Sequence, residues 1–104
     1  ASVIHLFVQL PKNRDECLVC GKQMLRSGTS VAAHVREASR ARSDAEFISK
    51  LGGALQEADE TQLWLELLRE DCGIDPAMGL PIEQEADELI AIITTMIRRT
   101  GGKR

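Results

Sequence analysis

The segment from Ser43 to Gly73 places the tightest constraint on the fold of this chain. Its apolar and small residues recur at spacings of three and four, which is the period of one face of an α-helix. Ser43 stands three positions before Glu46, a capping-box pattern that starts a helix, and Gly73 is typical of a helix end. The face consists of Phe47, Leu51, Ala54, Ala58, Thr61, Leu65, Leu68 and Cys72. We therefore expect a long helix over residues 43–72, with more apolar residues than one face needs.

A second helix is expected to begin after Pro11, where Asn13 or Asp15 offers a short polar side chain to cap the first turn. Its inward face has the same period and is rich in small residues, so that a neighbouring helix approaches closely. These residues are Cys17, Gly21, Met24, Gly28, Val31, Val35 and Ala38. The pattern is that of a helix packed inside a bundle.

The last helix is expected to run from about Glu83, after a connection rich in Gly and Pro over residues 73–81. Acidic residues crowd its first turns and Arg98 and Arg99 close it, an order that the helix dipole favours. Its expected inward residues are Ala86, Leu89, Ile90, Ile93, Met96 and Ile97.

Ahead of Pro11 the chain offers only a short apolar segment, from Val3 to Leu10. Three aromatic residues and no Tyr count against a β-sandwich. We therefore predict an all-α fold, an up-and-down four-helix bundle in a single domain over residues 1–104, whose first helix is short or truncated. The surplus apolar residues of the 43–72 helix predict subunit contacts, with Leu63, Trp64 and Leu67 as candidate interface residues.

The net charge of −3 is distributed unevenly along the chain. Residues 1–50 carry eight basic and five acidic residues, residues 51–97 carry Arg69 against eleven acidic residues, and the last seven add four basic residues. Such a chain presents a basic face and an acidic face. No apolar run approaches the roughly 20 residues needed to cross a bilayer, so no membrane association is expected. Three cysteines, an odd number, predict no disulfide framework and a reducing, cytoplasmic compartment.

Residues 26–38, 43–51 and 54–68 are similar to the four-helix-bundle proteins first noticed in intervening sequences of bacterial 23S ribosomal RNA genes. The similarity extends over roughly residues 10–100, and His34 stands where that family usually has Asn. The residues that fit the family pattern are Glu37, Ala38, Glu57, Glu60 and Trp64.

This resemblance implies an up-and-down four-helix bundle, commonly assembled as a homopentamer, with no established catalytic activity. The accessory variability determinants of diversity-generating retroelements are a related group with a similar fold. Those proteins form pentameric barrels that bind a reverse transcriptase and nucleic acid through a basic surface. For this chain, nucleic-acid binding is an expectation by analogy.

A basic stripe is expected along the helix that contains residues 15–38. At about 100° per residue its four members fall within an arc of about 80°. They are Lys22, Arg26, Arg36 and Arg40. A ring of subunits multiplies such a stripe, and phosphate binding grows steeply with the number of neutralised contacts. No aromatic residue lies among them, so base stacking is not implied. The alternative is a solvated face, or pairing with acidic residues of the next helix.

A polar cluster is the second candidate site, and it is expected where the two long helices meet. Its members are His34, Glu37, Glu57 and Glu60. Carboxylates at a helix–helix boundary need a partner that offsets their desolvation, so we expect them to hold the neighbouring helix or a neighbouring subunit through His34, Arg36 or Arg40. The alternative is general acid–base or metal chemistry. A di-iron bundle requires two Glu-x-x-His motifs, whereas this chain has one, in reversed order.

Cys17 and Cys20 have the spacing of a redox or zinc pair, although a lone pair falls short of a four-ligand site. The sequence thus predicts a non-enzymatic, homo-oligomeric scaffold or adaptor without cofactor, with RNA or DNA as candidate ligands of the basic stripe. One alternative is a small metal or redox protein that uses the polar cluster or these two cysteines. Another is a structural subunit that docks a basic protein partner on its acidic face, through residues such as Glu66 and Glu70.

Overall fold

The structure is a computed structural model that describes residues 2–11 and 13–102. Four helices make up nearly all of this part of the chain, and it contains no strand. They are α1 (Ser2–Gln9), α2 (Asp15–Ser39), α3 (Asp44–Asp71) and α4 (Pro76–Gly102). The predicted all-α four-helix bundle with a short first helix is confirmed. No helix in the described ranges is long and apolar enough to span a membrane.

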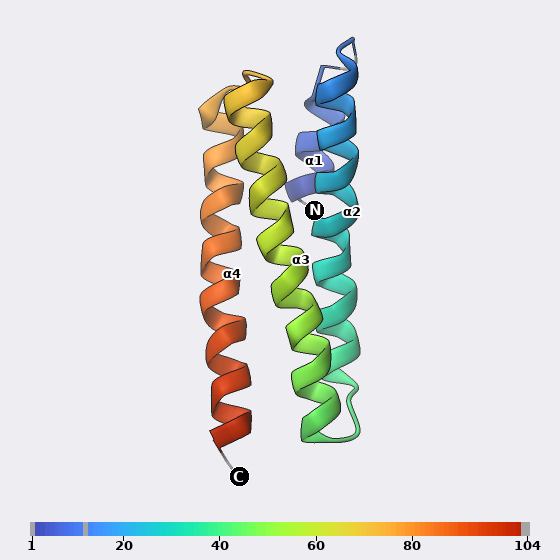
Figure 1. Cartoon of the computed structure of the whole chain (residues 1–104), viewed down its shortest axis with the longest axis vertical. Coiled ribbons are helices and arrows are strands. Elements are labelled where there is room, and N and C mark those ends of the chain that lie inside the picture. Colours follow the sequence, from blue (N-terminus) through green and yellow to red (C-terminus); the bar gives the residue numbers. More distant parts are fainter. Residues whose placement is uncertain (1, 12, 103–104) are drawn as a thin grey trace.

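In cross-section the helices occupy the four corners of a square, and the bundle measures 51 × 19 × 18 Å. Along the described chain, the pairs in contact are α1–α2, α2–α3, α3–α4 and α1–α4, so α2 and α4 occupy opposite corners. Figure 1 shows that α2, α3 and α4 run the full length, whereas α1 fills its corner at one end only. We call this the α1 end, and the opposite end, with the α2–α3 connection and the C-terminus of α4, the basal end.

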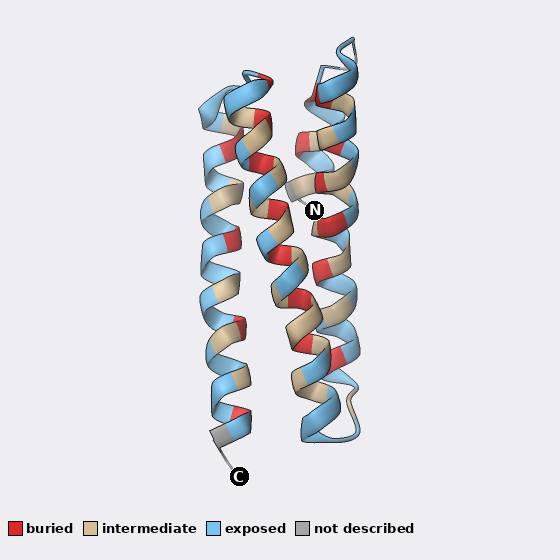
Figure 2. Ribbon diagram, viewed as in Figure 1, coloured by how far each residue is buried: buried red, intermediate tan, exposed pale blue. Residues whose placement is uncertain are grey.

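Two apolar clusters form the core and lie one above the other along the bundle. Figure 2 shows that the buried residues lie on the sides of the helices that face one another. At the α1 end the buried residues are Leu6, Leu10, Cys17, Met24, Leu65, Leu68, Cys72 and Ile74, and α4 contributes the partly buried Met78 and Ile82. At the basal end only α2, α3 and α4 contribute, through Val31, Ala38, Leu51, Ala54, Ala58 and Ile93. The second cluster is built from smaller side chains, three of them alanines.

The prediction for α3 is confirmed in detail. The side chain of Ser43 accepts a hydrogen bond of 3.1 Å from the backbone N–H of Glu46, as a capping residue does. The predicted inward face is buried throughout, except that Phe47 is half-buried. Gly73 follows the helix with φ +65°, the left-handed conformation that lets glycine stop a helix.

The starts of α2 and α4 differ from prediction. α2 is preceded by Arg14 and has no side-chain cap from Asn13 or Asp15. α4 begins at Pro76, about two turns earlier than expected, and carries Pro81 within it. Proline suits the first position of a helix because its missing N–H has no intrahelical partner there. Asp75 supports this start, since its carboxylate accepts a 3.0 Å hydrogen bond from the N–H of Ala77.

Three residues predicted to face inward are exposed instead. They are Val35 on α2, which is 41% exposed, and Leu89 and Met96 on α4, at 42% and 39%. The prediction was wrong for Val35 and Leu89 because α1, as described, does not extend alongside these positions. Below α1 the fourth corner is open, and Val35 and Leu89 line the space that remains.

The expectation that the cysteines stay unpaired is also wrong. Cys17, at the start of α2, forms a disulfide with Cys72, which follows α3, with their Cα atoms 5.7 Å apart. The antiparallel course of α2 and α3 brings these ends together although 55 positions separate the residues. Cys20 is a free thiol, so in this structure Cys17 and Cys20 do not form the redox pair that was considered as an alternative. Because two of the three cysteines form a disulfide, the cysteine count no longer argues for a reducing compartment.

Candidate nucleic-acid interface

The four residues of the predicted basic stripe all lie exposed on the solvent-facing side of α2. From Lys22 to Arg40 the helix rises about 27 Å at 1.5 Å per residue. The stripe therefore spans most of the length of α2, and α2 runs along the long axis of the molecule (Figure 1). Its members nevertheless differ in whether they already form an ion pair with an acidic side chain.

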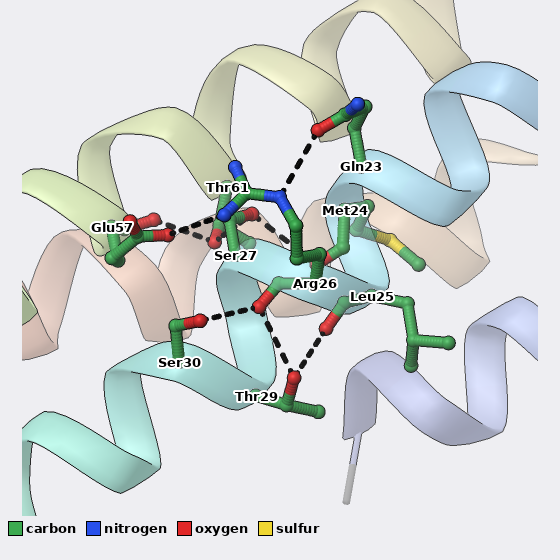
Figure 3. Close-up of polar contacts among 9 residues, drawn as sticks. All are labelled: Gln23, Met24, Leu25, Arg26, Ser27, Thr29, Ser30, Glu57 and Thr61. Carbon is green, nitrogen blue, oxygen red and sulfur yellow. Dashed lines mark hydrogen bonds and ion pairs between the residues drawn. The ribbon is translucent and has the colours of Figure 1, made fainter.

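Arg26 is engaged with the neighbouring helix. Its guanidinium points across to α3, where Nη1 lies 3.9 Å from Oε2 of Glu57, and its Nε donates a 3.3 Å hydrogen bond to Gln23 (Figure 3). The sequence predicted that Glu57 holds the neighbouring helix, and the cation that it meets is Arg26 instead of Arg36 or Arg40. Arg26 is consequently less available to a ligand than the other three cations.

A group of five arginines gathers at the basal end, and none of them has an acidic partner among the described residues. We call them the basal arginines: Arg36, Arg40, Arg42, Arg98 and Arg99. Six basic and three acidic side chains occur over residues 36–50 and 95–102, whereas the rest of α3 and α4 is predominantly acidic. Like charges held together in this way create the positive potential that attracts an anion.

Three of the basal arginines were not predicted as site residues. Arg42 follows Arg40 by two positions and was overlooked, whereas only the fold brings Arg98 and Arg99 to this end. A hollow of about 390 Å³ is lined by Arg42 and Ser43 from the α2–α3 connection and by Thr100 from the last turn of α4. The C-terminus of α4 therefore lies beside the α2–α3 connection. The basic residues after the last apolar turn, Arg98 and Arg99, were the available signal in the sequence.

The predicted polar cluster divides into two parts along the contact of α2 with α3. In the first part, Nδ1 of His34 lies 3.6 Å from Oε1 of Glu37, whose other oxygen accepts a 2.9 Å hydrogen bond from Nζ of Lys50. This ammonium lowers the pKa of Glu37 and the carboxylate in turn raises the pKa of Lys50. The ring of His34 packs over Gly53, where an added Cβ would lie 2.9 Å from it.

In the second part of the cluster, Glu57 faces Arg26, and its Oε2 is buried without a hydrogen bond. Glu60 is half-buried, on the same side of α3. No group of three or more His, Cys, Asp or Glu side chains in the described ranges is arranged to hold a metal ion. The arrangement is that of charged side chains which join two helices.

The similarity to known proteins is clear. The model of the 23S rRNA-intervening sequence protein family matches residues 1–95. The chain belongs to this family. A solved structure from Bacteroides thetaiotaomicron, described as a protein of unknown function from the S23 ribosomal protein family, is 40% identical and superposes with a TM-score of 0.82. The match covers 91% of this chain and 87% of that one. Among curated proteins no match is found.

For this member of the intervening-sequence protein family, the three candidate interface residues on α3 differ in exposure. Leu63 is 49% exposed, whereas Leu67 is half-buried. Trp64 packs against the core cluster at the α1 end, and its Nε1 is buried with no hydrogen-bond partner in the described structure. Leu63 is thus the side chain of the three that offers most apolar surface to a neighbour.

Proposed function

We propose that this protein is a non-enzymatic scaffold that assembles with copies of itself and holds RNA or DNA by its phosphate backbone. The observation that carries the proposal is the group of basal arginines, which the fold concentrates at one end without acidic partners among the described residues. Four other cations, Arg14, Arg26, Lys50 and Arg69, are occupied by ion pairs. Lys22 also lacks an acidic partner among the described residues, but it lies apart on α2, so the basal arginines are the grouped cations with most to gain from an external anion.

The chemistry of these residues fits phosphate better than a base edge. Arginine presents a planar fork of donors that matches two phosphate oxygens. The exposed side of α2 carries no aromatic residue on which a base would stack. Contacts to phosphate position a nucleic acid without reading its sequence, so we expect binding with little sequence preference.

Self-assembly increases the number of such contacts. The exposed Leu63 provides an apolar contact on α3, away from the basal arginines, and the family resemblance suggests five copies. Each added subunit contributes another set of arginines to the same particle. Because affinity rises steeply with the number of neutralised phosphates, a modest charge on one chain becomes a strong binding surface on a ring.

Light scattering coupled to size-exclusion chromatography tests both parts of this proposal, with and without a short single-stranded RNA. We expect a homo-oligomer that takes up RNA at low salt and releases it as salt rises. Charge reversal in R36E/R40E should abolish uptake while preserving the oligomer, and Leu63→Glu should reduce the oligomer. Lys22→Glu, at the other end of α2, is the matched control. A monomer at micromolar concentration contradicts the assembly, and unchanged uptake by R36E/R40E contradicts the RNA site.

A further inference from the structure

All three cysteines of the chain lie at the α1 end of the bundle. Cys17 and Cys72 form the disulfide, with their Cα atoms 5.7 Å apart, and both are buried. Cys20 is a half-buried free thiol, and it packs against the core cluster to which both bonded cysteines belong. A thiol held beside a disulfide has the arrangement that thiol–disulfide exchange requires, in which a thiolate attacks one sulfur of the bond and displaces the other.

Cys17 and Cys20 stand about one turn apart at the start of α2. Residues three apart on a helix are neighbours, with Cβ atoms about 5–6 Å apart, whereas a disulfide needs about 3.5–4.5 Å. The first turn of α2 must therefore tighten by about 1–2 Å before these two cysteines can bond. This turn is free to adjust, because Arg14 precedes it and no side chain caps it.

The register of α2 against α3 decides which of the two bonded sulfurs Cys20 can reach. Cys17 lies opposite Cys72, and Cys20 lies three residues further along α2, a rise of about 4.5 Å. For Cys20 to bond Cys72, α2 would have to slide along α3 by about this distance. The buried hydrogen bond of 2.8 Å between the hydroxyls of Ser27 and Thr61 opposes such a slide. The sulfur of Cys17, on the same helix as Cys20, is therefore the one that is attacked.

The geometry points to an exchangeable disulfide, in which the thiolate of Cys20 attacks Sγ of Cys17. The Cys17–Cys20 bond forms, the Cys17–Cys72 bond breaks, and Cys72 leaves as a thiolate. Cys72 then takes up one proton from the solvent, which replaces the proton that Cys20 lost on becoming a thiolate. The electrons balance within the chain, so the step needs no oxidant or reductant. This inference is separate from nucleic-acid binding, since it uses none of the basal arginines.

Exchange removes the only covalent link between the start of α2 and the end of α3 in the described chain. α1 contacts α2 and α4, while α2 and α4 make no backbone contact with each other over their described lengths. The spacing of the two helices that hold α1 thus depends on how both are joined to α3. Breaking the link should loosen α1 and the connection over residues 73–75, while the second apolar cluster keeps the basal end closed. The exchange is therefore a conformational switch of the α1 end.

Peptide mapping distinguishes the two forms. Trypsin cuts after Lys and Arg, so Cys17 and Cys20 fall in one peptide, residues 15–22, and Cys72 falls in another, residues 70–98. Protein purified without reductant is incubated at about pH 8, where thiolate is present, and then unfolded in guanidinium with excess N-ethylmaleimide. Before exchange, mass spectrometry finds the two peptides linked and Cys20 labelled. After exchange the peptides are separate, residues 15–22 contain an internal disulfide, and Cys72 is labelled.

Two variants complete the experiment. In C20S/V19C the thiol moves by one position to a residue that is 58% exposed, two positions from Cys17, where the side chains do not face each other. The thiol count and the tryptic peptides are unchanged, so this is the matched control. Cys72→Ser, oxidised with glutathione disulfide, holds the Cys17–Cys20 bond and represents the exchanged form for hydrogen exchange.

We expect separated peptides from about 1–10% of the wild-type protein, the population of a minor state a few kcal/mol above the major one. C20S/V19C should give linked peptides only. In oxidised Cys72→Ser, the amides of α1 should exchange at least about tenfold faster than in wild type, while those of the basal end should be unchanged. The proposal is overturned if wild type yields no separated peptides, if the control exchanges as much as wild type, or if fragmentation shows a Cys20–Cys72 bond. Unchanged protection of α1 in oxidised Cys72→Ser overturns the conformational switch.

Discussion

The hydroxyl oxygens of Ser27 and Thr61 lie 2.8 Å apart in the interior of the bundle, where they join α2 to α3 between the two apolar clusters (Figure 3). Both residues are buried. Thr61 also donates a 2.7 Å hydrogen bond to the backbone carbonyl of Glu57, and Ser27 contacts the carbonyl of Met24 at 3.3 Å. The pair thus satisfies its own polar groups and fixes the axial position of α2 against α3.

The Ser27–Thr61 contact is expected to show strong coupling in a double-mutant cycle. Ser27→Ala and Thr61→Val should each lower the free energy of unfolding by about 1–2 kcal/mol, because each leaves one buried hydroxyl with fewer partners. The double variant should lose less than the sum of the two, since it removes both polar groups together. Urea unfolding measures all four free energies. Strict additivity would mean that the hydroxyls do not interact.

The Cys17–Cys72 disulfide is expected to stabilise the fold by restricting the unfolded chain. Reduction, or the Cys72→Ser substitution, should lower the free energy of unfolding by about 2–4 kcal/mol, since the bond closes a loop of more than fifty residues. Cys20→Ser is the control and should leave the melting temperature nearly unchanged, because its thiol is free. Titration with a thiol reagent after unfolding should detect one thiol without reductant and three after reduction. Three thiols in protein purified under oxidising conditions would contradict the bond.

Two helical glycines are expected to respond in opposite ways to alanine. At Gly52 an added Cβ meets no atom within 4 Å, so Gly52→Ala should stabilise the protein by about 0.5–1 kcal/mol through its better helix propensity. At Gly28 the Cβ would lie 2.9 Å from both methyl carbons of Val3, whose β-branched side chain has little freedom to move. Gly28→Ala should therefore loosen α1 and lower the melting temperature. Hydrogen exchange of α1 amides localises the effect, and unchanged protection would show that α1 does not depend on this contact.

The Glu37–Lys50 pair gives a defined pH dependence. Lys50 lowers the pKa of Glu37 below its ordinary value of 4.5, so the contribution of this carboxylate to stability is present above pH 4.5 and is lost as the pH falls through the lowered value. Glu37 raises the pKa of Lys50 above 10.5, so the lysine contributes below pH 10.5 and loses its contribution as the pH rises through the raised value. Lys50→Met should melt at a lower temperature than wild type near neutral pH. This difference between the two proteins should become smaller at both low and high pH. A difference that is constant from pH 3 to pH 12 would refute the pairing.

Much of the fold was predictable because α3 combines a capping box, an uninterrupted period and a glycine stop in one segment. Each of these signals is local, and each is found in the structure. The start of α4 was not predictable in the same way, since Pro76 and Pro81 resemble a loop in sequence but lie in a helix that Asp75 supports. Val35 was misplaced for a non-local reason, because its burial depends on how far α1 extends along α2.

The candidate site was only partly predictable. Periodicity alone placed Lys22, Arg36 and Arg40 on one exposed side of α2. It did not show that Arg26 would be taken by Glu57, since that pairing depends on the register of α2 against α3. Nor did it bring Arg98 and Arg99 to the basal end, because this requires that α4 end beside the α2–α3 connection. The arginines that remain free are thus a product of the tertiary fold.

The salt dependence of single-strand RNA binding tests the central claim most directly. The logarithm of the binding constant should fall linearly with the logarithm of salt concentration, with a slope of about −0.7 for each neutralised phosphate. Replacing both arginines in R36Q/R40Q should make this slope shallower by at least about 1.4. Lys22→Gln, remote from the basal end, should leave the slope close to that of wild type. If wild type and R36Q/R40Q bind RNA with the same slope, the account is contradicted, because the phosphates must then contact another part of the protein.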